Sequence, residues 1–165
     1  MRFERADAFS ANGYDQACFY ISTNIGEELR PLQEIASGGE LSRIMLAMKS
    51  CLANQDDTPT LVFDEIDVGI SGRTAQKVAE KMSILSRHHQ VICITHLSQI
   101  AAMADAHYLI EKNVEKEKTI TSIRLLSKEE EIEELARMIG GAKITETTIH
   151  TVTEMKGLAE QAKIN

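Results

Sequence analysis

Two acidic residues follow directly on a short apolar run in the segment LVFDE, residues 61–65. Asp64 in this place could hold Mg²⁺, directly or through water, beside a nucleotide phosphate. Glu65 could accept a proton from an attacking water molecule. A strand that simply leaves the core into a polar loop would also end in acidic residues, so the pattern alone leaves that structural interpretation open.

A histidine follows a second apolar run, VICIT, at position 96. His96 could form a hydrogen bond with a phosphate oxygen or with the attacking water. The alternative is a loop histidine that caps the next helix, and the sequence alone does not separate these two roles.

The segment SGGE, residues 37–40, combines a helix-capping pattern with two glycines. Ser37 and Glu40 have the spacing of a capping box, in which each side chain satisfies a backbone N–H of the other residue. Gly38 and Gly39 weaken a helix, and they are useful where another backbone or a phosphate comes close. Capping and phosphate binding both remain possible roles for this segment.

The segment DVGISGR, residues 67–73, places Asp67 before two glycines. It reads either as a plain turn or as a segment that crosses to a partner and senses a nucleotide.

Apolar periodicity predicts the elements that carry these residues. Apolar positions 41, 44, 45, 48 and 52 indicate a helix with one buried face, and positions 75, 78, 82 and 85 indicate a second helix. The runs TLVF (60–63) and VICIT (91–95) are typical of strands buried on both faces of a parallel sheet. The remaining predicted elements are a strand over 14–22, a short helix over 98–104, a third strand over 107–111, an edge strand over 119–126, a capped helix over 127–141, and a last helix over about 146–162.

This order of helices and strands predicts an α/β fold with a mostly parallel sheet and flanking helices. Functional groups in such sheets gather at the carboxyl ends of the strands. We therefore expect Asp64, Glu65 and His96 to lie at one edge of the sheet.

Composition narrows the class of protein. The 165 residues suit a single domain, 1–165. A net charge of -7 argues against a whole surface that binds nucleic acid, although a local basic patch remains possible. The three cysteines lack metal-binding spacing and favour a reducing compartment, and no apolar run has the length of a membrane span. We expect a cytoplasmic protein without membrane contact.

Four motifs in this order resemble the C-terminal half of an ABC-type ATPase head. ASGGE resembles the ABC signature, TLVFDE the Walker B strand, IDVGISG the D-loop, and ITH the switch histidine. The longer stretches around them, together with LARMIGG, resemble the RecN family of bacterial SMC-like proteins of DNA double-strand break repair. The phosphate-binding motif G-x-x-x-x-G-K-[ST] does not occur in the chain.

The resemblance implies a P-loop NTPase-like C-terminal lobe without the Walker A half, as a fragment of a longer protein. It implies that Asp64 positions Mg²⁺, that Glu65 activates water and that His96 contacts the γ-phosphate of ATP. The segment Ser37, Gly38, Gly39, Glu40 would meet ATP bound to an opposing head, and Asp67 would couple the two sites. The implied partners are the N-terminal lobe of the same protein, a second head in a homodimer, and nucleoid DNA through the full-length protein.

Two other functions stay open at this point. The chain could be a non-catalytic module that supports head dimerisation in an SMC-like protein. It could also be a fragment of a transporter nucleotide-binding domain, but Ala36 and Glu40 are more typical of SMC-like signatures than of transporter signatures.

Overall fold

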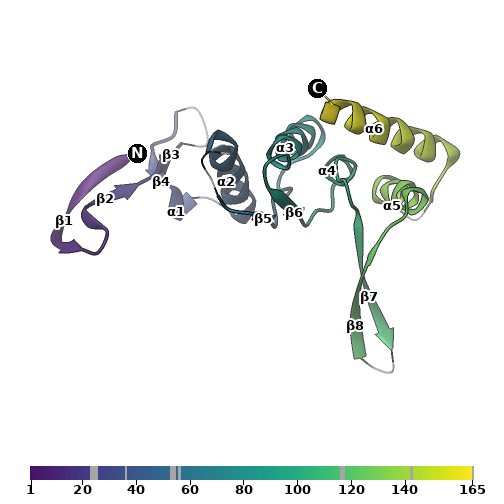
Figure 1. The fold of residues 1–165 in the computed structure, drawn as a ribbon, viewed down its shortest axis with the longest axis horizontal. Coiled ribbons are helices and arrows are strands. Elements are labelled where there is room, and N and C mark those ends of the chain that lie inside the picture. The colour runs from purple at the N-terminus through teal and green to yellow at the C-terminus, as the bar shows by residue number, and fades with distance from the viewer. Residues whose placement is uncertain are drawn as a thin grey trace.

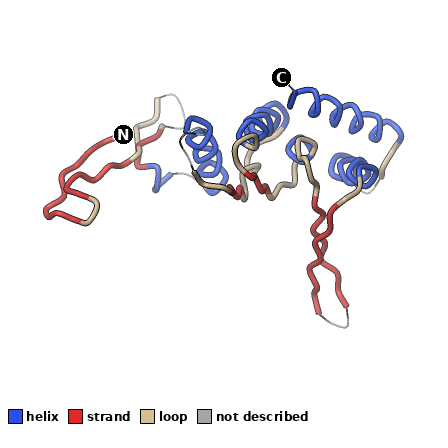
Figure 2. Tube along the Cα trace, viewed as in Figure 1, coloured by secondary structure: helices blue, strands red, loops and turns tan. Residues whose placement is uncertain are grey.

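The fold is that of a computed structural model, which describes residues 1–22, 26–35, 37–52, 55, 57–115, 118–141 and 143–164. Helices form most of an elongated body, and two strand hairpins project from it (Figures 1 and 2). The elements in chain order are β1 (Arg2–Ser10), β2 (Gly13–Cys18), β3 (Tyr20–Ile21), β4 (Arg30–Pro31), α1 (Leu32–Ile35), α2 (Gly38–Leu52), β5 (Thr60–Phe63), α3 (Gly72–Leu85), β6 (Gln90–Cys93), α4 (Ser98–Ala101), β7 (Tyr108–Glu115), β8 (Lys118–Leu125), α5 (Lys128–Gly140) and α6 (Glu146–Ile164).

The central unit is a parallel pair of strands joined by a helix. β5 and β6 pair in parallel from Thr60 opposite Gln90 to Phe63 opposite Cys93. Parallel neighbours need a crossover connection, and α3 supplies it. The two predicted apolar strands and the helix between them are therefore confirmed.

The prediction of a mostly parallel sheet is wrong for the described residues. The predicted third strand lies in β7, which pairs antiparallel with β8 from Tyr108 opposite Leu125 to Glu115 opposite Lys118. These two strands follow one another closely in the chain, so they form a hairpin and not a crossover. β1 with β2 and β3 with β4 are also antiparallel pairs.

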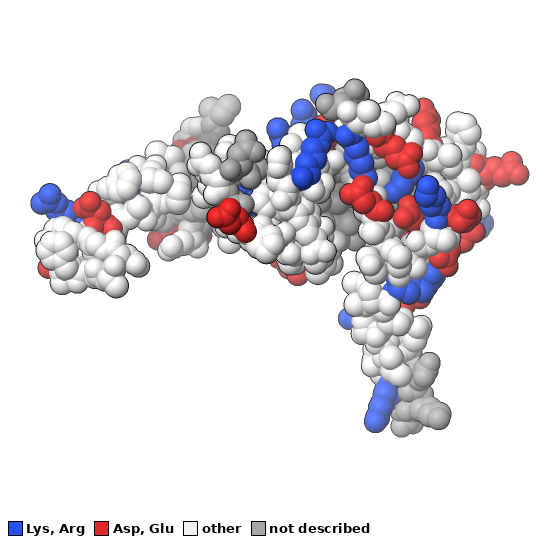
Figure 3. All heavy atoms as spheres, viewed as in Figure 1, with Lys and Arg blue, Asp and Glu red and all other residues white. Residues whose placement is uncertain are grey.

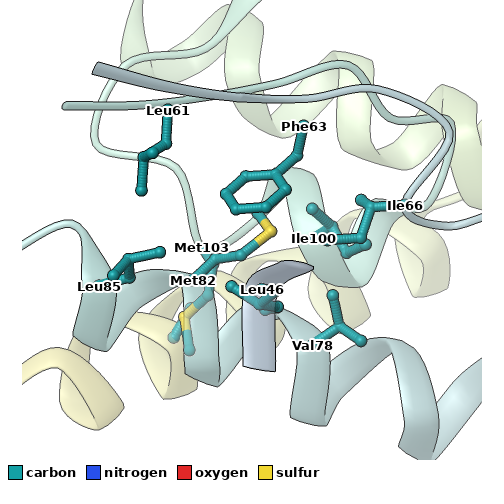
Figure 4. Close-up of a cluster of buried hydrophobic side chains, with 11 residues drawn as sticks. Leu46, Leu61, Phe63, Ile66, Val78, Met82, Leu85, Ile100 and Met103 are labelled. Atoms are coloured by element: carbon teal, nitrogen blue, oxygen red, sulfur yellow. The ribbon is translucent and has the colours of Figure 1, made fainter. Parts of the chain in front are cut away.

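The main hydrophobic core lies where α3 covers one face of the parallel pair (Figure 4). The predicted apolar face of α3 is confirmed, because Ala75, Val78, Met82 and Leu85 are all buried. The other core side chains come from α2, β5, the loop after it, α4, the segment after α4, and α6: Leu46, Leu61, Phe63, Ile66, Ile100, Met103 and Ala159.

A second core cluster joins α4, α5 and α6. The predicted capping box of α5 is confirmed, since the Ser127 hydroxyl accepts from the Glu130 N–H and the Glu130 carboxylate accepts from the Ser127 N–H. Leu135 and Val152 are fully buried in this cluster.

None of the described helices is both long and apolar enough to cross a membrane. In the view of Figure 3, charged side chains gather over this helical end of the molecule.

The predicted buried face of α2 is wrong in large part. Leu41, Met45 and Leu52 are 47%, 43% and 47% exposed, whereas Leu46 is 4% exposed. The side of α2 that meets the rest of the chain carries Gly39, Arg43 and Leu46, so a small residue and a polar residue decide the packing. Leu41, Met45 and Leu52 thus face solvent, whereas Ile44 and Met48 are half-buried.

The parallel pair also leaves apolar side chains uncovered. Val62, Ile92 and Ile94 are 62%, 45% and 48% exposed. They alternate with inward residues such as Phe63, as the two-residue period of a strand requires. The prediction that these strands are buried on both faces is therefore wrong for the described residues, because only one face of the pair is covered.

We predict that Leu135→Ala lowers the free energy of unfolding by about 2–5 kcal/mol, because it leaves a cavity in a closed cluster. Urea unfolding followed by circular dichroism measures the change. Ile139→Ala, one turn later on α5 and 43% exposed in the wild type, is the matched control and should cost far less. Equal losses for the two variants would contradict the assigned core.

We also predict that the chain self-associates through the uncovered face of β5 and β6, since exposed contiguous apolar surface promotes association. Light scattering over a range of concentrations measures this. Ile92→Lys should reduce the association, whereas Ile164→Lys, at a site 84% exposed near the end of α6, should not. A wild-type monomer at every concentration would contradict the prediction.

Candidate functional site

The predicted acidic residues and the predicted histidine lie at one edge of the parallel pair. β5 ends at Phe63 and β6 ends at Cys93, and the Ile94 N–H donates to the Phe63 carbonyl at 3.0 Å. Asp64 and Glu65 leave the first strand as His96 leaves the second. The expectation that these three residues share the carboxyl edge is therefore met by the backbone.

The loop after β5 lies directly against the start of α2. A Cβ atom on Gly39 would be 2.8 Å from the Glu65 carbonyl oxygen and 2.9 Å from the Val68 carbonyl oxygen, and a Cβ atom on Gly38 would overlap Oε2 of Glu65. At Gly39 the neighbours are backbone oxygens that cannot turn aside, so this position needs glycine for the loop to approach. At Gly38 the neighbour is the end of the exposed Glu65 side chain, which can move away. Gly39 thus has a structural reason within a single chain.

The capping box at the start of α2 is present. The Glu40 Oε2 atom accepts from the Ser37 N–H at 2.9 Å and from the Ser37 hydroxyl at 3.0 Å, and the Glu40 N–H donates to the Ser37 hydroxyl oxygen at 3.4 Å. The hydrogen bonds from the Ser37 backbone and side chain lower the pKa of Glu40. The carboxylate is therefore engaged at the helix start, where negative charge is favourable.

Asp67 is the buried acid of the site, at 3% exposed. It accepts at Oδ2 from the Thr95 hydroxyl at 2.6 Å and from the His96 N–H at 2.7 Å, and His96 Nδ1 lies 3.0 Å away. Burial acts to raise the pKa of Asp67, but the bonds from Thr95 and His96 and the charge of His96 outweigh it and lower that pKa. Asp67 thus joins the ends of the two strands.

Thr95 was not among the predicted site residues. Besides its bond to Asp67, its hydroxyl oxygen accepts from the Leu97 N–H at 3.0 Å. The signal in the sequence that could have indicated Thr95 as a site residue was its position directly before His96. The side chain of His96 itself is 69% exposed, so Asp67 fixes one side of the ring and leaves the rest open to solvent.

Glu65 adopts a rare backbone conformation. Its φ of 56° makes it the one described non-glycine residue in the left-handed region. Such strain costs on the order of 1–3 kcal/mol and often occurs at functional positions. Its N–H donates to Oδ1 of Asp64 at 2.9 Å. Both side chains are exposed and can reach a ligand at the strand ends.

Two polar residues of α2 hold the loop, and sequence reasoning missed both. The Ser42 hydroxyl donates to the Asp64 carbonyl at 2.8 Å. Nη1 of Arg43 donates to the carbonyls of Ile66 and Val68, at 2.9 and 2.8 Å. Their targets are backbone atoms far along the chain, and a pattern search does not reveal such contacts.

The described residues contain no group of three His, Cys, Asp or Glu side chains that could hold a metal ion. Asp64 alone can still contribute to Mg²⁺ binding, because Mg²⁺ commonly uses one or two carboxylates together with substrate phosphates and water. Burial, followed by the charges of Asp67 and Asp64, raises the pKa of Cys93 to about 12. Cys93 is therefore a thiol at neutral pH and a poor nucleophile.

Comparison with known proteins relates the chain to bacterial DNA repair proteins. No family model matches it. It is 48% identical over 157 residues to a DNA repair protein of Halalkalibacterium halodurans, covering 95% of the chain and 28% of the relative. A Bacillus subtilis relative is 48% identical over 92% of the chain, and a Treponema pallidum relative is 50% identical over 87%.

All three relatives are the DNA repair protein RecN. The chain corresponds to the C-terminal part of RecN, as its motifs led us to expect. It spans about a quarter of the length of these relatives, with 28%, 26% and 25% covered.

Among the solved structures that match, one has a TM-score of 0.47 and 24% identity, covering 68% of the chain and 67% of that structure's chain. That work concerns ATP-driven dimerization and DNA stimulated activation of SMC ATPases.

We predict that Asp67→Asn lowers the free energy of unfolding at pH 7 by about 1–3 kcal/mol, because buried donors lose a charged acceptor. The folded-state pKa of Asp67 lies below its ordinary value of 3.8. Its contribution is thus full above that value and is lost as the pH falls through the folded-state pKa.

Urea unfolding of wild type and Asp67→Asn at a series of pH values tests this. The difference between the two proteins should shrink on acidification below pH 3.8. The exposed Asp15→Asn is the control and should follow the wild type. A difference that stays constant with pH would refute the assigned role of the Asp67 charge.

Proposed function

We propose that the chain is the C-terminal lobe of the ATPase head of a RecN-like DNA repair protein, with a P-loop NTPase-like fold. The proposal treats residues 1–165 as one domain that acts with the rest of a longer protein. In this role the chain supplies the signature, Walker B, D-loop and switch-histidine segments to an ATP site formed by two heads.

One observation carries the proposal. The loop of residues 64–68 lies at the carboxyl edge of β5 and β6, with His96 held on one side and the start of α2 on the other. Ligands of α/β sheets bind at this edge. The four motif segments that are separate in the sequence thus occupy one region of the molecule. The RecN relatives support the same function.

Asp64 and Glu65 have distinct proposed roles in hydrolysis. Asp64 would help to hold Mg²⁺, which when bound neutralises developing charge on the phosphates. Glu65 would accept a proton from water as the water oxygen attacks the γ-phosphorus and the bond to the β,γ-bridging oxygen breaks. ATP and water would yield ADP and inorganic phosphate, and the strained backbone of Glu65 fits a residue placed for function.

The Asp67 contact defines what the His96 ring can do. A carboxylate only accepts, so Nδ1 of His96 donates to Asp67 and Nε2 is the atom left for a ligand. A neutral ring would accept a hydrogen bond from the attacking water at Nε2. A protonated ring would donate from Nε2 to a γ-phosphate oxygen.

The start of α2 would face the nucleotide of the opposing head. The first N–H groups of a helix lack partners within the helix and lie at its positive end, so the backbone at Gly38 and Gly39 suits an anion. Ser37 and Glu40 would border this site and hold the turn through their capping bonds. Because Gly38 and Gly39 also contact the Glu65 loop, both sites share one structural unit. Asp67 would help to couple the two sites through this loop.

The rest of the protein would complete the lobe. The uncovered face with Val62, Ile92 and Ile94 suits the N-terminal lobe, which would also bring the phosphate-binding motif that the chain lacks. The isolated chain would then be inactive. We further propose a homodimer of heads, DNA binding through the full-length protein, and a cytoplasmic, nucleoid-associated location.

A non-catalytic dimerisation module is the second candidate. The exposed apolar residues of α2, β5 and β6 favour it, because they suit contacts with another surface. It does not account for the strained Glu65 or for the buried Asp67 that holds His96. A transporter domain fits less well, since the matched relatives are DNA repair proteins.

We predict that Glu65→Gln in the full-length protein lowers ATP turnover by about 100-fold or more while ATP binding persists, because the variant lacks the proton acceptor. Phosphate release and binding of a fluorescent ATP analogue measure the two quantities. Glu154→Gln, at an exposed position on α6, should leave turnover unchanged. Wild-type turnover in the Glu65→Gln protein would overturn the proposal.

A further inference from the structure

Ser42 and Arg43 form a clamp on the loop after β5. Their side chains bind three alternate carbonyl groups of this loop: Asp64, Ile66 and Val68. Arg43 contributes two of these bonds from a single nitrogen, Nη1. The clamp therefore fixes the backbone on both sides of Glu65 without using any side chain of the loop.

Arg43 also lies next to Gly39, at the start of α2, where this helix meets the loop. A Cβ atom on Gly39 would lie 3.0 Å from Nη1 of Arg43, next to the Glu65 and Val68 carbonyl oxygens. The guanidinium thus fills the space where the start of α2 meets the loop. A displacement of either segment would break at least one of its two bonds.

We propose that Arg43 is a positioning residue for hydrolysis: it holds Glu65 in its left-handed conformation and links it to the Ser37–Glu40 segment. The inference rests on the proposed function, since it concerns the ATPase reaction. A charged donor makes stronger bonds to carbonyl oxygens than a neutral one, which suits a backbone conformation that is unfavourable by itself. Arg43 would act through Glu65 and would not touch the substrate.

The test uses the full-length protein with Arg43→Met, Arg43→Lys, Glu65→Gln and the double variant Arg43→Met/Glu65→Gln. We expect Arg43→Met to lower kcat by about 10-fold or more with KM within about twofold, as for a loss confined to the transition state. Arg43→Lys should recover part of the loss, because an ammonium group retains charge and several donors.

The double variant separates positioning from general structural support. If Arg43 acts through Glu65, the double variant turns over ATP as slowly as Glu65→Gln alone, since effects on one unit are not additive. Radiolabelled ATP resolves this slow turnover. Losses that multiply, a rise in KM alone, or an unchanged kcat in Arg43→Met would each overturn the inference.

Thermal unfolding controls for loss of fold, with Lys77→Met on the exposed side of α3 as the matched loss of a positive charge. If Arg43→Met does not fold, Arg43→Lys and Arg43→Gln decide the question by the same kcat, KM and double-variant criteria.

The two proposals fail in different ways. If the wild-type protein shows no ATP turnover that is lost in Glu65→Gln, the proposed function is contradicted. Turnover that depends on Glu65 but not on Arg43 would remove only the positioning role.

Discussion

The candidate site depends on the close approach of two backbone segments, the start of α2 and the loop after β5. Gly39 permits it, because a side chain there would collide with the carbonyl oxygens of Glu65 and Val68. The clamp then holds the segments together through three carbonyl groups. The helix start, the strained Glu65 and the buried Asp67 thereby become parts of one rigid unit.

This unit lies at the edge of a fold that is only partly covered. α3 buries one face of β5 and β6, while Val62 and Ile92 on the other face remain exposed. Part of the apolar stripe of α2, with Leu41, Met45 and Leu52, is exposed as well. The chain spans about a quarter of its RecN relatives, and 28% of the first of them is covered. Exposed apolar surface next to a polar site is consistent with a lobe that works against another lobe.

Local patterns predicted the elements, and tertiary contacts decided the rest. The runs at 60–63 and 91–95 and the capping residue Ser127 are local signals, and the structure confirms two paired strands and the helix cap. It does not confirm the predicted burial of both faces of those strands. The exposure of Leu41 and the antiparallel pairing of β7 depend on which surfaces pack against each other. The spacing of apolar residues along the chain does not determine this. For the same reason the motifs indicated Asp67 but not the contact that joins it to His96.

The most direct measurement is ATP hydrolysis by this chain alone and after mixing with a separately prepared N-terminal part of the protein, with Glu65→Gln chain in parallel. The account predicts turnover only in the mixture and loss of that turnover with the variant chain. Turnover by the chain alone, unchanged by Glu65→Gln, would contradict the claim that this chain supplies one half of an ATPase head.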